Sequence, residues 1–598
     1  MTKPFPSEPL RYPVPQKGHA VYGSDLMVDL LAELGAEYVF INPGSSFRGL
    51  HDSLVNYHGN AGPEIVLVTH EMIAVAMAHG YWKATGKPAV CILHNLVGLM
   101  SGSMAIFNAF CDQAPILILG GSGPADPRQR RFIDWAHSAN TQSDLVRPFV
   151  KWTDEPATLE ASLDAILRAR RITLTAPQGP AYLSLDAGHQ EQEAGEIARP
   201  DAGLPRYQAP APIHPDPEAI AKLADLMLAS RKPLVIGGRF GLDAEITGPL
   251  VELIELTGAG YMDDRAIVCV PTGHPQNISG DRGFRSDADL VVCFDVQDLT
   301  AATGGYGSQR SGIMGAGAGV EGATIVDISL NDYFGNSWTR FGGPIPPLDL
   351  QITADSKLAL QALLKALKAR AGSADAEPIA ERRAALKTRK EALDAKRRAV
   401  LEKRWDETPI ALERVTHEVH AALTGKPWSL VVRNHRTWAE GYWQFGGAGE
   451  YLGGDGGGGV GYGPGAAAGA ALGLKGSGRL PVAMLGDGDF MMTPGAVWSA
   501  CHHGAPLLMI LLNNTSWGND ELHQREIATH RGRSSQTAHI GQTTRDPEVD
   551  LLKVASGFGA ATFGPVSDPA ELAGILAQAI ARVEAGEVAV VEVITALE

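Results

Sequence analysis

The segment Gly486–Ser516, GDGDFMMTPGAVWSACHHGAPLLMILLNNTS, decides the fold of the last third of the chain. The preceding PVAMLG run has the composition of a buried strand, PGAVWSACHH predicts a helix with Pro494 in its first turn, and PLLMILL predicts the next strand. A β-α-β crossover brings the carboxyl ends of two parallel strands to the same edge of a sheet. We therefore expect Asp487 and Asn514 to face each other at that edge.

The polar residues of this segment match the needs of a magnesium ion that carries a phosphorylated ligand. A carboxylate, an amide oxygen and a backbone carbonyl form a set of hard oxygen ligands, which Mg²⁺ prefers. Glycines beside them let the backbone approach phosphate oxygens closely. The predicted metal ligands are Asp487, Asn514 and Ser516, and the same segment contributes Gly486, Gly488 and Asp489 to ligand binding.

Short apolar runs alternate with helical stretches along three parts of the chain. The runs include YVFINPG and APILILGG in the first part, KPLVIGGR and ATIVDIS in the second, and WSLVVRN and VAVVEVI in the third. This alternation predicts an α/β protein with three doubly wound parallel-sheet domains. The expected boundaries are residues 1–200 for an N-terminal domain, 213–370 for a central domain, 371–404 for a helical linker and 405–598 for a C-terminal domain.

Composition narrows the class of protein. The 598 residues carry a net charge of −16, which disfavours binding to nucleic acid or to an anionic membrane surface. The first residues contain no apolar segment typical of a secretory signal. The five cysteines are scattered and form no CxxC pair, as expected for reduced thiols. We expect a cytoplasmic protein without membrane or nucleic-acid partners.

The GDG motif, followed by NN at this spacing, resembles the metal-diphosphate signature of thiamine diphosphate-dependent enzymes of the acetolactate synthase and decarboxylase type. The resemblance covers essentially the whole chain and implies a pyrimidine-binding N-terminal domain and a diphosphate-binding C-terminal domain. It implies thiamine diphosphate and Mg²⁺ as cofactors. It also implies a homodimer or homotetramer whose active sites lie between subunits. In the central domain, Gly237-Gly238 and Gly241 are a weak signal for FAD or for CoA/ADP.

Residues elsewhere in the chain match further parts of that family's site. Glu71, in IVLVTHEMIAVAMAHG, is a lone acid between an apolar strand and an apolar helix, and the resemblance implies that it shares a proton with the aminopyrimidine ring. A glutamate that only stabilises the start of a helix is the alternative. In GGGGVGYG, Val460 matches the residue that supports the bent cofactor, and the carbonyl of Gly458 matches the acceptor for its amino group. Candidate diphosphate ligands are Asn434, Arg436 and Thr437.

Three motifs resemble those of benzoylformate decarboxylase. INPGSS places Ser45 on a substrate-binding serine, ILHNLVG places His94 on one active-site histidine, and VPTGHPQN places His274 on another. A hydroxyl and two imidazoles could move protons to and from substrate. The segment NNTSWGNDELHQRE departs from this pattern because Asp520 and Glu521 add acids, which we count as candidate catalytic residues. The segment RRFIDWAHSANTQ instead resembles actinobacterial 2-hydroxyacyl-CoA lyase.

These features predict an enzyme that cleaves or forms a C–C bond next to a carbonyl, most simply a 2-oxo acid decarboxylase or lyase. The expected substrate is a 2-oxo acid, a 2-hydroxy ketone or an acyl-CoA. A 2-hydroxyacyl-CoA lyase and an acetolactate synthase-like carboligase are the alternatives. A dehydrogenase would need a GxGxxG motif after an early strand, which we do not find. A non-catalytic relative would be expected to lack Glu71, Asp487 or Asn514, and all three are present.

Overall fold

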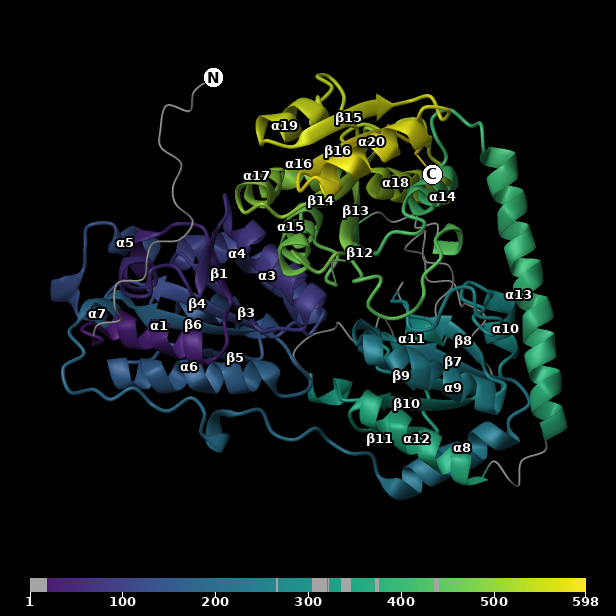
Figure 1. Ribbon diagram of the computed structural model, residues 1–598, viewed down its shortest axis with the longest axis horizontal. Helices are drawn as coiled ribbons and strands as arrows, with labels where there is room; N and C mark the ends of the chain where they lie inside the picture. Colours follow the sequence, from purple (N-terminus) through teal and green to yellow (C-terminus); the bar gives the residue numbers. More distant parts are fainter. Residues whose placement is uncertain are drawn as a thin grey trace. The chain divides into compact units, whose positions relative to one another are not determined.

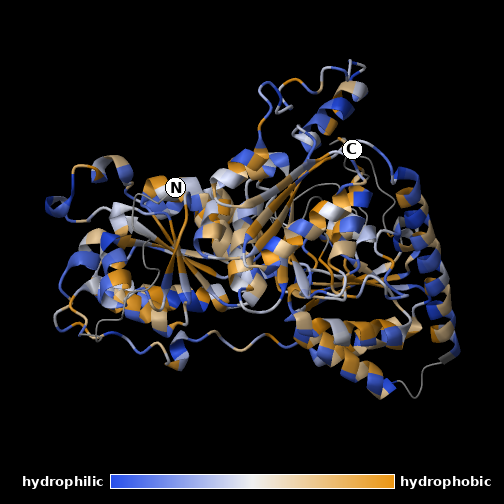
Figure 2. Cartoon of the chain, turned by 45° about the horizontal axis from the view of Figure 1, so that its top comes forward, coloured by the Kyte–Doolittle hydropathy of each residue, from blue (hydrophilic) through white to orange (hydrophobic). Residues whose placement is uncertain are grey.

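The computed structural model describes residues 19–264, 267–303, 320, 322–334, 346–370, 376–434, 440–454 and 456–597. It contains three β-sheets of parallel strands with helices packed around them, which confirms the predicted fold class (Figure 1). The strands are the most hydrophobic ribbons in Figure 2, whereas the helices mix hydrophobic and hydrophilic residues. In the described part of the chain, no helix has both the length and the apolar character that crossing a membrane requires.

The first sheet has six strands in the order β2-β1-β3-β4-β6-β5. Its winding reverses between β1 and β3, and open α/β sheets bind ligands outside the carboxyl ends of their strands at such a point. The strands are β1 (Tyr38–Ile41), β2 (Glu64–Leu67), β3 (Ala89–Leu93), β4 (Ile116–Ser122), β5 (Trp152–Asp154) and β6 (Ala181–Asp186). The helices are α1 (Gly23–Glu33), α2 (Arg48–Asp52), α3 (Glu71–Thr85), α4 (Leu96–Cys111), α5 (Asp134–His137), α6 (Leu159–Leu174) and α7 (Ala187–Glu191).

The second sheet has five strands in the order β11-β10-β9-β7-β8, with a reversal between β7 and β9. Its strands are β7 (Pro233–Gly237), β8 (Gly260–Asp263), β9 (Leu290–Phe294), β10 (Thr324–Ser329) and β11 (Leu350–Thr353). Its helices are α8 (Pro217–Ala229), α9 (Thr247–Thr257), α10 (Arg282–Asp287), α11 (Leu299–Ala302) and α12 (Ser356–Arg370). The long polar helix α13 (Ala376–Arg404) then leads to the third sheet, in the region predicted to be a helical linker.

The third sheet has five strands in the order β12-β13-β14-β16-β15. Its strands are β12 (Trp428–Asn434), β13 (Leu480–Gly486), β14 (Leu507–Asn513), β15 (Ala561–Val566) and β16 (Val588–Ile594). The helices of this region are α14 (Leu412–Ala422), α15 (Gly463–Gly473), α16 (Asp487–Met492), α17 (Gly495–His502), α18 (Gly518–His530), α19 (Leu551–Gly557) and α20 (Leu572–Glu584). The predicted strand, helix and strand around the GDG motif are all present.

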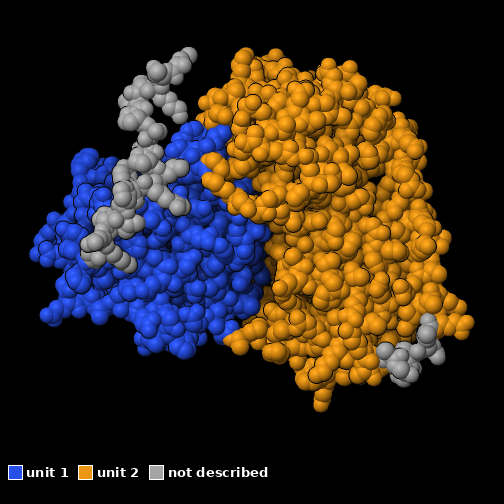
Figure 3. Space-filling model, in the orientation of Figure 1, with its two compact units in different colours: residues 1–210, 456–473, 498–503 blue, residues 211–455, 474–497, 504–598 orange. Residues whose placement is uncertain are grey.

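The residues form two compact units by their packing (Figure 3). The first unit comprises residues 1–210, 456–473 and 498–503, and the second comprises the rest of the chain. The first sheet lies in the first unit, and the other two sheets lie in the second. Each sheet falls inside one of the predicted domains, whereas the exact boundaries of those domains stay a prediction.

Helix α15 belongs to the first unit because it packs against α3. The two helices approach so closely that only glycine fits at the contact. A Cβ atom at Gly80 would lie 2.0 Å from the Ala466 carbonyl oxygen, and one at Gly469 would lie 1.9 Å from the Met77 carbonyl oxygen. The glycine-rich run of the sequence is therefore a packing surface.

Candidate active site

Strands β13 and β14 are parallel neighbours in which Gly486 pairs with Leu512. The residues that follow the two strands, Asp487 and Asn514, therefore lie at the same edge of the third sheet, as predicted. Asp487 is also the first residue of α16, a short helix that was not predicted from the sequence. An acid at the start of a helix interacts favourably with the helix dipole.

The Asp487 carboxyl group is buried and incompletely paired. Only 4% of the residue is exposed. Its Oδ2 atom has no hydrogen-bond partner among the described residues. Burial raises the pKa of Asp487 to about 6, although the backbone amides of Gly488 and Thr515 act in the opposite direction. A buried carboxylate with an unused oxygen is unfavourable by itself and is suited to a bound cation.

The paired asparagines shape the turn that follows β14. Asn513 Oδ1 accepts a hydrogen bond from the Thr515 backbone N–H at 2.8 Å, and its Nδ2 donates to Glu592 Oε1 at 2.7 Å. Asn514 Oδ1 accepts from the Ser516 backbone N–H at 3.0 Å. Asn513 therefore holds the turn to β16, and Asn514 is the asparagine that stays partly exposed at the edge.

The other residues of this edge have structural contacts. Gly488 lies against the Trp517 ring, where a Cβ atom would come within 2.8 Å of a ring carbon. The Ser516 hydroxyl donates to Glu521 Oε2 at 2.6 Å, and Arg525 contacts the same carboxylate. Burial raises the pKa of Glu521, but these two partners outweigh burial, so the pKa is lowered. Of the two candidate acids, Glu521 is thus buried and paired, whereas Asp520 is exposed.

The donor set at this edge fits a magnesium ion bound to phosphate. The described residues contain no cluster of three or more His, Cys, Asp or Glu side chains that could hold a metal alone. Asp487 offers a buried oxygen without a partner, and Asn514 and the Ser516 carbonyl lie in the adjoining turn. One carboxylate with neutral oxygens leaves coordination positions for phosphate and water, which is the usual arrangement for Mg²⁺. Gly486 ends β13, and Asp489 is buried in α16.

Glu71 is the first residue of α3 and is buried. The preceding residue, His70, caps the helix by accepting a hydrogen bond from the Met72 backbone N–H at 3.1 Å. The Glu71 side chain faces Gly98 of α4, where a Cβ atom would lie 3.0 Å from Glu71 Oε1. The absence of a side chain at Gly98 therefore leaves room beside this carboxylate.

The glycine loop before α15 is held by the first unit. Asn108, a fully buried residue of α4, donates from Nδ2 to the Gly459 carbonyl and accepts from the Gly459 N–H, both at 3.3 Å. Gly458 has a φ of +75°, which favours glycine, and Val460 is 37% exposed. Asn108 thus fixes the segment that contains both predicted cofactor contacts. Of the predicted diphosphate ligands, Asn434 ends β12, and Arg436 and Thr437 lie outside the described residues.

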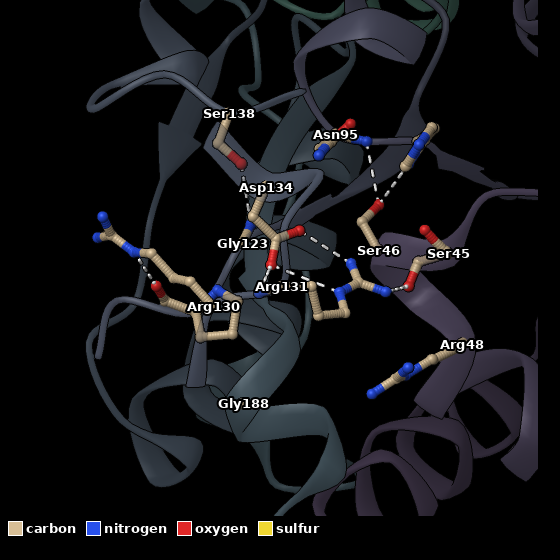
Figure 4. Close-up of polar contacts among 12 residues, drawn as sticks. Ser45, Ser46, Arg48, Asn95, Gly123, Arg130, Arg131, Asp134, Ser138 and Gly188 are labelled. Atoms are coloured by element: carbon tan, nitrogen blue, oxygen red, sulfur yellow. Dashed lines mark hydrogen bonds and ion pairs between the residues drawn. The ribbon is translucent and has the colours of Figure 1, made fainter. Parts of the chain in front are cut away.

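A second polar group lies at the reversal point of the first sheet (Figure 4). His94, which follows β3, shares a hydrogen bond of 2.7 Å between its Nδ1 and the hydroxyl of Ser46, which follows β1. The predicted residue Ser45 has an exposed side chain, and its carbonyl accepts from Arg131 at 3.0 Å. Ser46 is thus the serine that contacts His94, and binding of substrate by Ser45 stays a prediction. INPGSS contains both residues, and only the backbone geometry distinguishes them.

His94 has a second imidazole beside it. The ring of His137, at the end of α5, is 5.3 Å away between centroids and nearly perpendicular. Burial lowers the pKa of His94, and the charge of His137 lowers it further, whereas Glu71 acts in the opposite direction. His137 belongs to the segment RRFIDWAHSANTQ, whose resemblance to the lyase gives this residue no role of its own.

His274, the other predicted histidine, lies in the second unit. Its Nε2 is 3.4 Å from Glu255 Oε1 of α9, and its Nδ1 accepts from the Gln276 backbone N–H at 3.2 Å. Both ring nitrogens therefore have partners, one in α9 and one in the loop that follows β8.

The reversal point of the second sheet is occupied by its own residues. A Cβ atom at Gly238 would lie 2.1 Å from the Asp295 carbonyl oxygen. The Arg239 guanidinium follows and contacts Asp295 at 3.2 Å as well as Asn331. Gly238 thus permits β7 and β9 to pack, and nothing in these contacts supports FAD or CoA/ADP there.

Comparison with known proteins gives consistent matches. The model of the thiamine pyrophosphate enzyme N-terminal binding domain matches residues 21–144, and that of the C-terminal binding domain matches residues 432–593. The acetolactate synthase large subunit of Lactococcus lactis is 23% identical over 90% of this chain and 87% of its own length. The benzoylformate decarboxylase of Pseudomonas aeruginosa is 29% identical over 44% of this chain and 50% of its own.

A solved structure shares the fold. Benzoylformate decarboxylase from Polynucleobacter necessarius superposes with a TM-score of 0.73 at 20% identity and covers 96% of this chain and 99% of its own. The range matched by the N-terminal model includes Glu71 and His94. The range matched by the C-terminal model includes Asp487 and Asn514.

Proposed function

Because the chain belongs to the thiamine diphosphate-dependent enzymes of the acetolactate synthase and benzoylformate decarboxylase family, we propose that it decarboxylates a 2-oxo acid. The observation that carries this proposal is the position of His94. The ring is fixed through Nδ1 by Ser46, and His94 lies near Glu71, because a Cβ atom at Gly98 would lie 2.8 Å from His94 Cβ and 3.0 Å from Glu71 Oε1. A protonatable group beside the residue that activates the cofactor is suited to the proton uptake that decarboxylation requires.

The cofactor would be held by residues at two sheet edges. Asp487, Asn514 and the Ser516 carbonyl would bind Mg²⁺ and, through it, the diphosphate. Glu71 would face the aminopyrimidine ring, and Val460 would support the bent molecule. When bound, thiamine diphosphate supplies a nucleophilic carbon that adds to a substrate carbonyl and accepts the electrons of the C–C bond that breaks.

Glu71 lies in the first unit and Asp487 in the second. Since members of this family combine these two groups from different subunits, we propose a homodimer or homotetramer with shared active sites. The family resemblance implies this assembly because Glu71 of one subunit would act on a cofactor held by Asp487 of another.

Carboligation is the second candidate. It is favoured by the similarity to an acetolactate synthase subunit over 90% of this chain, about twice the share matched by the decarboxylase of Pseudomonas aeruginosa. In that reaction a second carbonyl compound, rather than a proton, would capture the carbon from which CO₂ has left. Cleavage of a 2-hydroxy ketone or a 2-hydroxyacyl-CoA is the reverse reaction, in which the C–C bond that ligation forms is broken.

The test is CO₂ release from a panel of aromatic and aliphatic 2-oxo acids after reconstitution with thiamine diphosphate and Mg²⁺. We expect release by the wild type, and a loss of roughly 10²-fold or more in Glu71→Gln, which should still bind the cofactor in a calorimetric titration. Because carboligation also releases CO₂, the organic product separates the two candidates: an aldehyde supports decarboxylation, whereas a 2-hydroxy ketone formed in its place would reject it in favour of carboligation. Full activity of Glu71→Gln would reject the assigned role of Glu71.

A further inference from the structure

We propose that His137 is a proton-relay residue that acts through His94, so that the two imidazoles together deliver one proton to the substrate. This inference rests on the proposed function and gives His137 the role that sequence motifs assign to His274. It starts from the 5.3 Å separation of the two rings at the reversal point of the first sheet.

The orientation of His94 leaves one of its nitrogens available. Nδ1 is engaged by the Ser46 hydroxyl at 2.7 Å. The same hydroxyl oxygen accepts the Asn95 backbone N–H at 3.1 Å, so its own hydrogen can point to His94. The ring is therefore held through Nδ1, and Nε2 is the nitrogen that can exchange a proton with a ligand.

His137 is held close to this ring by its own segment. Gly123, which follows β4, donates its backbone N–H to the Ser138 hydroxyl at 3.2 Å. Asp134, at the start of α5, binds Arg131, and Arg131 in turn binds the Ser45 carbonyl at 3.0 Å. These contacts tie the His137 segment to the same Ser45-Ser46 turn that holds His94 (Figure 4).

One ring nitrogen of His137, Nδ1, is buried and unpaired among the described residues. Buried side-chain nitrogens are normally paired, so an unpaired one calls for an explanation such as a bound ligand, water or a catalytic role. His274, in contrast, has partners on both nitrogens.

Two imidazoles at this distance tend to share one charge, because protonation of either ring disfavours protonation of the other. The other charged groups that act on His94 are Glu71, Arg131 and Asp134. Arg131 and Asp134 pair with each other at 3.0 Å, and their charges largely cancel. The pair is thus suited to carry one proton at a time.

The chemistry needs that proton. Conversion of R–CO–COO⁻ to R–CHO and CO₂ breaks one C–C bond and consumes one proton for each turnover. His94 Nε2 would give the proton to the substrate, and His137 would return one to the pair from solvent. Cleavage of a 2-hydroxy ketone also ends with protonation of the carbon left behind, so the pair would serve either reaction.

The first experiment follows the two imidazoles by NMR in the full-length protein labelled at histidine Cε1, without cofactor. Substituting His137→Gln should raise the pKa of His94 by roughly half a pH unit or more, because a neighbouring positive charge is removed. The matched control is His51→Gln, which changes an exposed histidine of α2 in the same unit. An unchanged His94 titration in His137→Gln would overturn the pairing.

The second experiment uses the loaded enzyme in whichever reaction the wild type shows, CO₂ release or 2-hydroxy ketone cleavage. We expect His137→Gln to lower kcat by roughly 10²-fold with little change in KM and to remove one limb of the pH profile of kcat. Added imidazole should partly restore His137→Ala. Activity of His137→Gln within about twofold of wild type, or a larger loss in His274→Gln, would overturn the proposal.

The two experiments separate failure of this inference from failure of the proposed function. If the wild type releases no CO₂ but cleaves 2-hydroxy ketones, the proposed decarboxylation fails while the histidine pair is still tested. If the wild type decarboxylates and His137→Gln matches it, the proposed function stands and the pair is rejected. A wild type active in neither reaction would reject both.

Discussion

Asp487 shows how burial of one carboxyl group can reduce the stability of a folded protein at neutral pH. Burial raises its pKa to about 6, so between about pH 4 and 6 the folded chain keeps a proton that the unfolded chain has lost. The stability associated with this group is therefore fully present at low pH and is lost as pH rises through 6. At neutral pH the penalty is about 3 kcal/mol, which cation binding would relieve.

We therefore predict that removing this charge stabilises the protein without ligands but abolishes the stabilisation that ligands provide. Asp487→Asn should stabilise the cofactor-free protein at pH 8 by about 2 kcal/mol, because it removes a buried charge. Wild type should gain stability from added Mg²⁺ and thiamine diphosphate, and the variant should gain little. Thermal melts with and without ligands measure both effects. Asp164→Asn, on the exposed side of α6, is the control and should melt like wild type.

A cofactor-free Asp487→Asn that melts below wild type at pH 8 would contradict this account of the carboxylate. The pH dependence gives a second check. Affinity for Mg²⁺ and cofactor should fall below about pH 6, by up to tenfold per pH unit, since a proton then competes for the same oxygen.

The residue scale also shows where motif reasoning ends. GDG and NN at their spacing were enough to place Asp487 and Asn514 together, because the intervening strands must be neighbours. Ser45 and Ser46 are adjacent letters in INPGSS, and which hydroxyl meets His94 depends on backbone torsions that the motif does not contain. His137 could not be paired with His94 either, because its segment is 43 residues away and lies on a different connection of the sheet.

At the scale of elements, α3 and α15 depend on small residues at their contact. Apolar runs bounded by turn residues predicted every strand of the third sheet that we quoted, since a buried parallel strand has few other compositions open to it. The pairing of α15 with α3 was not predicted. A run of glycines and alanines has no hydrophobic periodicity from which a partner could be inferred.

We predict that Gly469→Ala destabilises the protein by roughly 2 kcal/mol or more, because the added methyl would meet the Met77 carbonyl at 1.9 Å. The matched control is Gly574→Ala in α20, where nothing lies within 4 Å of the added atom. That change should be neutral or stabilise by up to about 1 kcal/mol, as expected for alanine in a helix. Urea unfolding monitored by circular dichroism compares the two. Equal midpoints for both variants would argue against the close contact.

At the scale of the whole molecule, subunit mixing tests the proposed shared sites. Glu71→Gln and Asp487→Ala subunits, each inactive alone, should recover about a quarter of wild-type activity when dissociated and reassembled in equal amounts. Half of the dimers would then be mixed, and each mixed dimer would contain one site with both native residues. No recovery in assemblies shown by mass spectrometry to be mixed would mean that a single subunit supplies both groups.

The position of α15 in the first unit has a consequence for synthesis of the chain. The ribosome completes residue 210 long before it reaches residues 456–473 and 498–503, which the same unit requires. At about 5 to 20 residues per second, the 293 residues from 210 to 503 take roughly 15 to 60 s. During that interval the nascent chain exposes the face of α3 that α15 later covers. We expect the newborn N-terminal region to be a chaperone client until its last helix has been translated.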